Sequence, residues 1–579
     1  MADSILQDRK YDGDGNFSKF LKQPPLPNSL AISTVSKEEI IAIISKCIKP
    51  YKSSGPHSIP SNILLLIKDF IAEPLTKIIN ISMLTGSHPN LLKVAKIIPI
   101  FKKGSKLLTC NYRPISLLSN LNKIFEKVIF KRVYDFISSN NSIYNLQYGF
   151  RPKHSTNHAL IDITDNIRLA LDRGDYACGV FVDLQKAFDT VNHHILLKKL
   201  SHYGIRGPML DWFHSYLSNR KQITSILGFE SKQLDMLHGV PQGSVLGPLL
   251  FLIYINDLHN AITYSKTYLF ADDTNLLNIN SSIKKIQSEL NKDLKNLCLW
   301  LLANKISLNA AKTELIFFRR PSQNIPEIKI KVNGKKLYPS NYIKYLGINL
   351  DENLTGSAHM SSLAPKLKRA NGMVAKIRHY VESDQLKSLH FSIFSSHMLY
   401  GSQIWGQVKN IDFRNLQVIQ NNAIRLISFE QDFRDHVSHL YVNLNILKLS
   451  DMIILQNILL VHDFFNHNLP QNLQTTLNLK LEHLQQDKDR RNPVLPKWFD
   501  DFIFPDNSFQ PREDPIPGQL SEPNYDSARY GRRSITNMAI NQWNFFNRLY
   551  ANEDLMSLPR TKLKRIIVNH FMNSYTINH

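Results

Sequence analysis

The chain is poor in cysteine, and the few cysteines it has are isolated from one another. They are Cys47, Cys110, Cys178 and Cys298, and none has a second cysteine or a histidine at the short spacing of a zinc site. Scattered single cysteines also provide no framework of disulfides. We therefore expect neither a zinc knuckle nor a disulfide-stapled secreted fold, but a protein of a reducing, intracellular compartment.

Long hydrophobic runs are missing as well. The longest, Val245–Ile255, contains Gly247 and Pro248, and it is far shorter than the roughly 20 residues that a membrane-spanning helix needs. The first residues show no basic stretch followed by an apolar one, so they do not read as a secretory signal. We expect a soluble protein with no membrane partner.

Acidic residues are too few to balance the basic ones. Lysine and arginine total 70 against 48 aspartates and glutamates, which leaves a net charge of +22. A solvated basic surface is one explanation. An excess of this size over a whole chain favours a polyanionic partner, and nucleic acid is the first candidate.

Among these few acids, two stand side by side in an apolar setting. Residues 269–277 read Leu-Phe-Ala-Asp-Asp-Thr-Asn-Leu-Leu, which predicts a tight β-hairpin with Asp272 and Asp273 at its tip. A third acid, Asp183, follows another apolar strand pattern. Burying neighbouring carboxylates is costly unless a cation accompanies them, and hard divalent cations take carboxylate oxygens. A solvated Asp-Asp turn is the alternative for Asp272 and Asp273 taken alone.

The three acids together match the ligand set of a two-metal nucleotidyl transferase. Such an enzyme uses two ions roughly 3.5–4 Å apart to activate a 3′-hydroxyl and to neutralise the leaving pyrophosphate. We predict that Asp183 and Asp272 bind both ions and that Asp273 completes the set. The expected cofactor is a pair of Mg²⁺ ions, for which Mn²⁺ can substitute. The resulting hypothesis is a polymerase.

Helical and strand patterns are mixed along the chain, which predicts an α+β fold with helices on one face of a sheet. From residue 361 the pattern is helical, and the basic residues lie off the apolar stripe of this helix. They form either a solvated face or a surface that follows a phosphate backbone. Strands are predicted at 94–101, 178–183, 223–237, 267–279, 314–318, 328–332 and 342–350, and helices at 36–44, 61–84, 120–136, 191–203, 208–217, 249–258, 282–302 and 534–572.

A series of short motifs runs in a fixed order along the chain. They are Lys96–Gly104, Asn111–Ser119, Gln147–Pro152, Phe181–Asp189, Gly239–Pro248, Phe270–Asp273, Leu308–Thr313 and Tyr345–Gly347. Any one is weak evidence, but the ordered set is specific. In it the chain resembles the reverse transcriptases of non-LTR (LINE-type) retrotransposons of the jockey-like kind, over about residues 35–450 and most strongly over 92–350.

The resemblance implies an RNA-directed DNA polymerase with a right-hand architecture: fingers, a palm built on an antiparallel sheet, and a thumb, followed by a mainly helical C-terminal region. Its partners are then an RNA template, a DNA primer, target DNA and dNTPs. The implied further site residues are the Leu184 carbonyl as a metal ligand, Lys102, Lys103, Arg113, Phe188, Gln242 and Lys312 around the dNTP, and Arg151, Tyr345, Leu346 and Gly347 at the template and primer.

Two of these implied roles have ordinary alternatives. At Phe188 the family selects against a ribose 2′-hydroxyl, because a flat ring under the sugar leaves no volume for that oxygen; the alternative is core packing. Lys312 matches the position proposed to protonate the leaving pyrophosphate, and the alternative is an exposed lysine before a strand.

The motifs also divide the chain. We predict an irregular lead-in at 1–34, an N-terminal helical extension at 35–91, reverse transcriptase fingers and palm at 92–350, a helical thumb and connection at 351–485, a Pro-rich linker at 486–530 and a C-terminal helical segment at 531–579. The first polymerase motif lies too early for a preceding endonuclease domain, so we expect a truncated or polymerase-only reading frame.

Several alternatives stay open. A catalytically inactive, nucleic-acid-binding relic of such a polymerase would have the same basic charge. A group II intron maturase or a telomerase-like enzyme would share the palm, although the motif set favours the non-LTR family. The family's template-primed integration implies a nuclear location, while the oligomeric state does not follow from the sequence.

Overall fold

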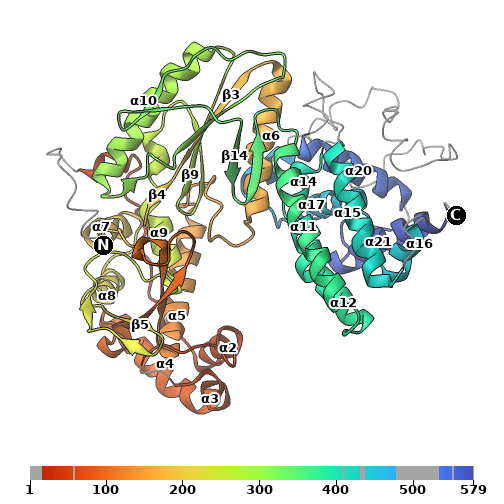
Figure 1. Cartoon of the computed structure of the whole chain (residues 1–579). Coiled ribbons are helices and arrows are strands. Elements are labelled where there is room, and N and C mark those ends of the chain that lie inside the picture. Colours follow the sequence, from red (N-terminus) through yellow and green to blue (C-terminus); the bar gives the residue numbers. More distant parts are fainter. Residues whose placement is uncertain are drawn as a thin grey trace.

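The computed structural model describes residues 16–56, 59–407, 411–430, 437–477, 534–550 and 553–577. Figure 1 shows two lobes: an N-terminal lobe that carries all the sheets, and a C-terminal lobe made of helices. The mixed helix and sheet content confirms the coarse fold prediction. The predicted Pro-rich linker at 486–530 and the first half of the lead-in lie outside the described residues.

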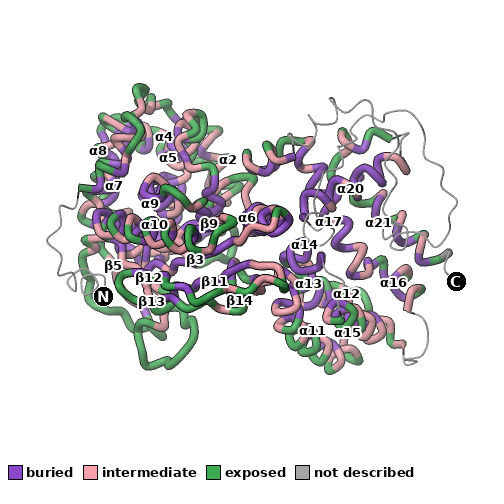
Figure 2. Tube along the Cα trace, turned by 90° about the horizontal axis from the view of Figure 1, so that it is seen from above, coloured by how far each residue is buried: buried purple, intermediate pink, exposed green. Residues whose placement is uncertain are grey.

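The central sheet has four antiparallel strands in the order β11-β3-β9-β8, as the sequence predicted for an antiparallel sheet. Side chains alternate along β3 between two hydrophobic cores: Cys178 and Val180 belong to one, Ala177 and Phe181 to the other. The sheet is therefore buried on both faces (Figure 2). Its strands are β3 (Tyr176–Val182), β8 (Lys266–Phe270), β9 (Asp273–Asn280) and β11 (Glu314–Phe318).

Helices cover both faces of this sheet, so the prediction of helices on one face was wrong. The helix that covers the second face is α6 (Thr156–Arg173), which the sequence patterns did not predict. It packs with the C-terminal helices, whereas the helices of the N-terminal lobe pack on the first face. The latter are α5 (Asn120–Ser139), α7 (His193–His202), α8 (Pro208–Leu217), α9 (Leu246–Ile255) and α10 (Ile283–Ala303).

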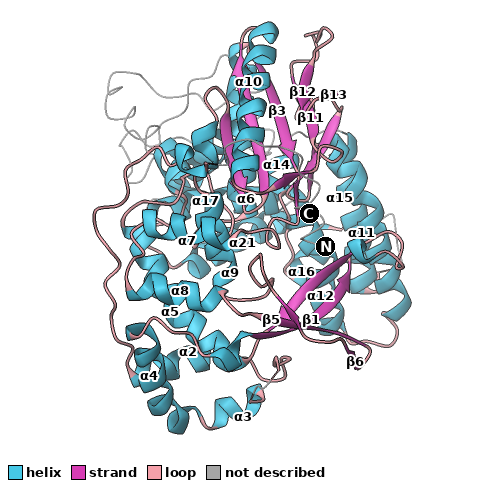
Figure 3. Ribbon diagram, turned by 90° about the vertical axis from the view of Figure 1, so that its left-hand side faces the viewer, coloured by secondary structure: helices cyan, strands magenta, loops and turns pink. Residues whose placement is uncertain are grey.

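A second, outer sheet lies below the first in Figure 3. In it β1 pairs with β2 antiparallel and with β5 parallel. The continuous strand predicted at 223–237 was wrong, because Leu227 and Gly228, with φ of 50° and 90°, form a tight turn that ends β5. The strands are β1 (Val94–Phe101), β2 (Tyr112–Leu117), β5 (Lys221–Ile226), β6 (Phe229–Glu230) and β7 (Leu234–Asp235).

Short strand pairs and N-terminal helices complete this lobe. The helix predicted at 61–84 is broken at Ile67, whose ψ of 11° departs from the helical value. The N-terminal helices are α2 (Lys37–Cys47), α3 (Ser61–Leu66) and α4 (Lys68–Leu84), and the short strands are β4 (Leu184–Gln185), β10 (Ser307–Leu308), β12 (Ile330–Val332), β13 (Lys335–Leu337), β14 (Tyr342–Tyr345) and β15 (Ile348–Asp351).

The C-terminal lobe is held to α6 by a buried acid. Asp165 accepts hydrogen bonds from the backbone N–H groups of Ile535 (2.6 Å) and Thr536 (2.9 Å), which open α20. The helices of this lobe are α11 (Ser357–Ile377), α12 (Ser383–Leu389), the π-helical turn η5 (His390–Ser395), α13 (Ser396–Leu399), α14 (Ser402–Trp405), α15 (Ile411–Ser428), α16 (Ser438–Leu444), α17 (Leu449–Phe465), α20 (Ile535–Leu549) and α21 (Arg560–Ile577).

Within the described ranges, no single helix has both the length and the apolar character to cross a membrane; only α16 and α17 together, bent by 48°, meet that standard by length and composition.

Candidate active site

The predicted aspartate pair lies at the tip of the β8–β9 hairpin. Phe270 pairs with Asp273, which leaves Ala271 and Asp272 as the turn. Ala271 has a φ of 55°, a left-handed conformation that is unfavourable for a residue with a Cβ. The tight hairpin of the sequence prediction is therefore present, with Asp272 in the turn itself and Asp273 as the first residue of β9.

The register of the central sheet brings the third acid to the same place. Val182, the last residue of β3, pairs with Thr274, so Asp183 leaves the strand at the end of the sheet where Asp273 begins β9. Carboxylates held close together at neighbouring strand ends repel. The backbone around Asp183 is fixed by the Asn309 N–H, which donates to the Asp183 carbonyl oxygen at 2.8 Å.

The pKa values of Asp272 and Asp273 reflect burial and the closeness of the negative charges. Desolvation, together with the charge of Asp183, raises the pKa of Asp272 above its ordinary value. Desolvation and the charges of Asp272 and Asp183 raise the pKa of Asp273 to about 6. Because the Asp273 side chain is exposed to solvent, repulsion from Asp272 and Asp183 is the main reason for its raised pKa.

A cation would relieve this repulsion, and the donor set of three carboxylates fits a hard divalent metal. In the described ranges, no three histidine, cysteine or acidic side chains are already arranged to hold a metal ion. The three acids lie at one end of the sheet and affect one another's pKa values, but their carboxylate groups are not arranged to coordinate one ion together.

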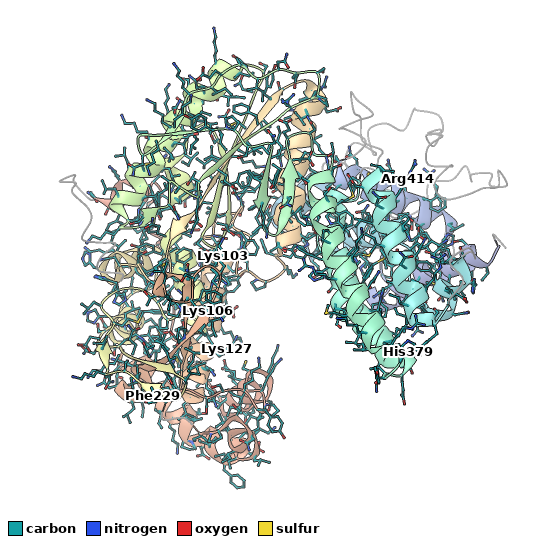
Figure 4. The ribbon with its side chains drawn as sticks, viewed as in Figure 1. Lys103, Lys106, Lys127, Phe229, His379 and Arg414 are labelled. Atoms are coloured by element: carbon teal, nitrogen blue, oxygen red, sulfur yellow. The ribbon has the colours of Figure 1, made fainter. Side chains whose placement is uncertain are left out.

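Basic residues surround the acids from two directions. The Lys312 Nζ lies 3.5 Å from the Asp183 Oδ2, and the lysine side chain is 64% exposed. From the outer sheet, the charges of Arg113 and Lys102 act to lower the pKa of Asp272. Lys103 follows Lys102 in the β1–β2 turn, on the side of the N-terminal lobe that faces the helical lobe (Figure 4).

Lys312 is brought to Asp183 by a compact turn. After β10 pairs with β4, the Asn309 carbonyl accepts hydrogen bonds from the N–H groups of Lys312 and Thr313, both at 3.1 Å. Leu184, whose carbonyl the resemblance implies as a metal ligand, lies in β4 with its side chain buried.

Phe188 lies between aromatic rings beside the site. Its ring stacks on Phe251 at a centroid distance of 4.5 Å and meets Phe150 edge-on at 6.1 Å. The Phe188 carbonyl oxygen accepts a hydrogen bond from the Val240 N–H at 2.9 Å. The loop at Gly239–Pro248 therefore holds the backbone of Phe188 in place. Packing on Phe251 agrees with the core alternative, and the ring is still partly exposed.

Gln242 is held by the turn that follows β4 and by the outer sheet. Its Nε2 donates to Asp189 Oδ1 at 2.8 Å, and its carbonyl accepts from the Ser116 N–H of β2 at 2.7 Å. Burial raises the pKa of Asp189, while the hydrogen bond from Gln242 opposes that rise. Asp189 was not predicted as a site residue; its place in the Phe181–Asp189 motif was the only signal.

The four residues predicted for template and primer contacts fall in two places. The Arg151 guanidinium donates to the carbonyls of Tyr144 and Gln147, both at 3.1 Å, so in this structure it braces a loop. The other three form the tip of the β14–β15 hairpin. There Leu346 and Gly347, with φ of 43° and 86°, make the turn, and Tyr345 is buried with its ring edge-on to Phe181 at 5.2 Å.

The helical lobe carries the basic face predicted after residue 361. The predicted apolar stripe of α11 faces the core: Leu363, Leu367, Ala370 and Val374 are buried, and Ile377 is half-buried. The opposite side of α11 and the adjacent α13 border a groove of about 850 Å³. Its lining is Lys366, Lys368, Arg369, Gly372, Met373, Lys376 and His397.

Comparison with known proteins agrees with this geometry. Residues 100–350 match the model of the reverse transcriptase (RNA-dependent DNA polymerase) family. This part of the chain is similar to a reverse transcriptase domain. It contains the hairpin with Asp272 and Asp273, the strand that leads to Asp183, and the turn with Lys312, and members of the family use divalent metal ions.

The most informative relatives come from Drosophila melanogaster. The chain is 30% identical over 419 residues to the RNA-directed DNA polymerase from mobile element jockey, which covers 70% of this chain and 45% of that protein. It is 30% identical over 420 residues to the probable RNA-directed DNA polymerase from transposon BS and 29% identical over 366 residues to that from transposon X-element. These matches confirm the resemblance to non-LTR retrotransposon enzymes. The chain spans less than half the length of each of these relatives.

Proposed function

We propose that the chain is the RNA-directed DNA polymerase of a non-LTR retrotransposon, adding dNTPs to a primer 3′-hydroxyl on an RNA template. The observation that carries this proposal is the meeting of Asp183, Asp272 and Asp273 at one end of the central sheet, with basic residues on two sides. The relatives named as RNA-directed DNA polymerases support it.

The lobes correspond to the parts of a right-hand polymerase in this proposal. The central sheet is the palm, and the outer sheet with its helices is the fingers, which places fingers and palm within 92–350 after the N-terminal helical extension at 35–91. The helices from Ser357 onward are the thumb and connection. The C-terminal segment at 531–579 belongs with them, because α20 packs on α17 and is capped by Asp165.

Asp183, Asp272 and Asp273, with the Leu184 carbonyl, are the residues that would hold two Mg²⁺ ions. When bound, such ions supply activation of the primer 3′-hydroxyl and neutralise the leaving pyrophosphate. The raised pKa values of Asp272 and Asp273 support this role, because a site built from mutually repelling carboxylates gains most from a divalent cation.

The β1–β2 hairpin and the Gln242 loop would hold the incoming dNTP. The Arg113 guanidinium can make bidentate, charge-assisted hydrogen bonds to phosphate, and Lys102 and Lys103 add positive charge beside it. Gln242, tied to Asp189 and to β2, would contact the nucleotide and templating base. The ring of Phe188 would exclude the ribose 2′-hydroxyl. The hydrogen bond from the Val240 N–H to the Phe188 carbonyl would keep the ring in position for this.

Lys312 would protonate the leaving pyrophosphate. Its amino group is 3.5 Å from Asp183 and largely exposed, so it can turn from that carboxylate toward a departing phosphate. Only the Lys312 side chain would have to move for this proton transfer, and the backbone would keep its conformation.

Nucleic acid would contact the β14–β15 hairpin and the helical lobe together, since the hairpin packs on that lobe and the Tyr400 hydroxyl donates to the Leu346 carbonyl at 2.6 Å. The turn at Tyr345–Gly347 would contact the primer end, and the basic groove on α11 would contact phosphates of the template–primer duplex. Arg151 would act at the template only if it released the loop that it braces. Target DNA and a nuclear location follow from the retrotransposon assignment and are proposed with it.

Primer extension tests the proposal. Wild-type protein with Mg²⁺ and dTTP should extend oligo(dT) on poly(rA), and Asp272→Asn should reduce the rate at least about a thousandfold, since it removes charge at the centre of the ligand set. Asp384→Asn, an exposed acid on α12 that loses the same charge far from the sheet, is the matched control and should extend normally.

A protein that binds template–primer but extends it in neither variant nor wild type would instead be the inactive relic. Extension that persists in Asp272→Asn would place the chemistry elsewhere in the chain.

A further inference from the structure

We propose that Gln147 is a positioning residue that sets the conformation of the catalytic turn, a role that rests on the proposed polymerase function. Gln147 lies in the motif Gln147–Pro152 and is 2% exposed. It precedes the Asp272 turn by more than a hundred residues in the chain, yet it contacts that turn directly.

The segment around Gln147 runs beside β8 as a short extra strand. The Tyr148 N–H donates to the Leu269 carbonyl at 2.8 Å, and the Leu269 N–H donates to the Leu146 carbonyl at 2.9 Å. Gln147 and Leu269 form a parallel bridge. The backbone of 146–148 is therefore attached to the strand that enters the hairpin tip.

The side-chain amide of Gln147 extends this attachment to the turn itself. Its Oε1 accepts from the Ala271 N–H at 3.0 Å and from the Gly149 N–H at 2.9 Å. Because both partners are N–H donors, only an oxygen satisfies them, which fixes the orientation of the amide. Ala271 is the residue with a φ of 55°, immediately before Asp272.

Two further residues make this contact specific. A Cβ at Gly149 would lie 2.4 Å from the Ala271 nitrogen, so only glycine allows the two segments to approach this closely. Arg151 donates to the Gln147 carbonyl at 3.1 Å and holds the loop from the other side. The motif thus forms a brace that ends on the backbone of the turn.

The brace accounts for a conformation that the turn would not hold alone. A left-handed alanine is unfavourable unless the surroundings over-determine it, and the Gln147 acceptor and the Gly149 backbone supply that constraint. Since the conformation of Ala271 sets the direction in which Asp272 leaves the turn, loss of the acceptor should displace the Asp272 carboxylate relative to Asp183 and Asp273. Metal binding should then suffer more than nucleotide or template binding.

The test compares three variants in the full chain. Gln147→Met keeps the length and removes the acceptor, whereas Gln147→Glu keeps an oxygen acceptor. Gln420→Met is the matched control: Gln420 is 1% exposed, and its Oε1 accepts the Leu449 N–H at 3.0 Å in the helical lobe.

We expect Gln147→Met to lower kcat at least tenfold and to raise the Mg²⁺ concentration for half-maximal rate at least threefold. The KM for dTTP and the Kd for template–primer should stay within twofold of wild type. Mn²⁺ titration by calorimetry should show the same weakened affinity without turnover. Gln147→Glu keeps the acceptor but adds a carboxyl group beside the acids, so it should retain more of kcat than Gln147→Met without reaching the wild-type value. Gln420→Met should change none of these values despite a comparable loss of melting temperature.

The proposal is overturned if Gln147→Met keeps wild-type kcat and metal dependence, or if Gln420→Met loses activity equally. A loss in Gln147→Met confined to template–primer binding also contradicts it. These outcomes differ from failure of the polymerase assignment, in which the wild type itself does not extend the primer.

Discussion

Buried or crowded carboxylates are accommodated in two different ways within the residues that match the reverse transcriptase family. Asp257 is 1% exposed, and its carboxylate lies 2.5 Å from the Lys199 Nζ and 3.3 Å from the Trp300 Nε1. Lys199 also donates to the Tyr254 carbonyl at 2.6 Å. This pair joins α7, α9 and α10 and is satisfied within the protein.

The three acids at the end of the central sheet are not neutralised in this way by any of the described residues. Asp183 lies 3.5 Å from the exposed Lys312, and burial and the neighbouring acids raise the pKa values of Asp272 and Asp273. The difference suggests a criterion for telling structural carboxylates from those of the proposed active site: a structural acid is neutralised by a buried cation, whereas an acid that binds a metal ion lacks such a cation until the ion is bound.

The largest expected effect breaks the structural pair. Lys199→Met should lower the free energy of unfolding by about 3–5 kcal/mol, because it leaves the Asp257 charge buried and unpaired. Urea denaturation measures this loss. Lys198→Met, at the exposed neighbouring lysine, is the control, and Lys199→Met combined with Asp257→Leu should recover most of the stability. An unchanged unfolding midpoint in the single variant would show that Asp257 does not depend on its ion pair.

The next prediction concerns the protonation of the proposed metal-binding carboxylates. These carboxylates must be deprotonated to bind a metal ion, and the pKa of Asp273 is raised to about 6. As the pH falls from 7 to 5, the Mg²⁺ concentration for half-maximal extension should therefore rise, by about tenfold per pH unit once the pH is below about 6. Rates measured against Mg²⁺ at a series of pH values test this. A half-saturation that is constant down to pH 5 would contradict the raised proton affinity.

The smallest effect is on the stability of the metal-free protein. The pKa of Asp273 is about 6 in the folded state and 3.8 ordinarily. The free energy of unfolding therefore falls as the pH rises from about 4 to about 6, and the full loss is present above pH 6. At pH 7 without metal, Asp273→Asn should therefore raise the melting temperature by roughly 1–3 °C, because a like charge close to Asp183 is removed.

Addition of Mg²⁺ sharpens that measurement. The ion should stabilise the wild type more than Asp273→Asn, since the variant has lost one ligand. Asp384→Asn should behave as the wild type with and without the ion. A variant that melts lower than the wild type in the absence of metal would mean that Asp273 makes a favourable contact in the folded state.

Much of the fold could be predicted from local patterns. The strands at 178–183 and 267–279, the hairpin tip at Asp272 and the long helix near 282–302 follow from alternating or helical apolar spacing. Helix α6 was missed because Asp162, Asp165, Arg168 and Asp172 are polar yet buried, which obscures its apolar face. Their partners come from elsewhere: Tyr148 donates to Asp162, and α20 donates to Asp165.

The candidate site shows the same division. Sequence order alone determined that Asp272 and Asp273 are neighbours, that a tight turn carries them, and which motifs accompany them. Tertiary structure decided that the charge of Asp183 acts on Asp273, that Arg113 and Lys102 influence the pKa of Asp272, and that the Gln147 amide holds Ala271. Local propensities act over a few residues, whereas strand register and packing select the partners that lie far apart in the chain.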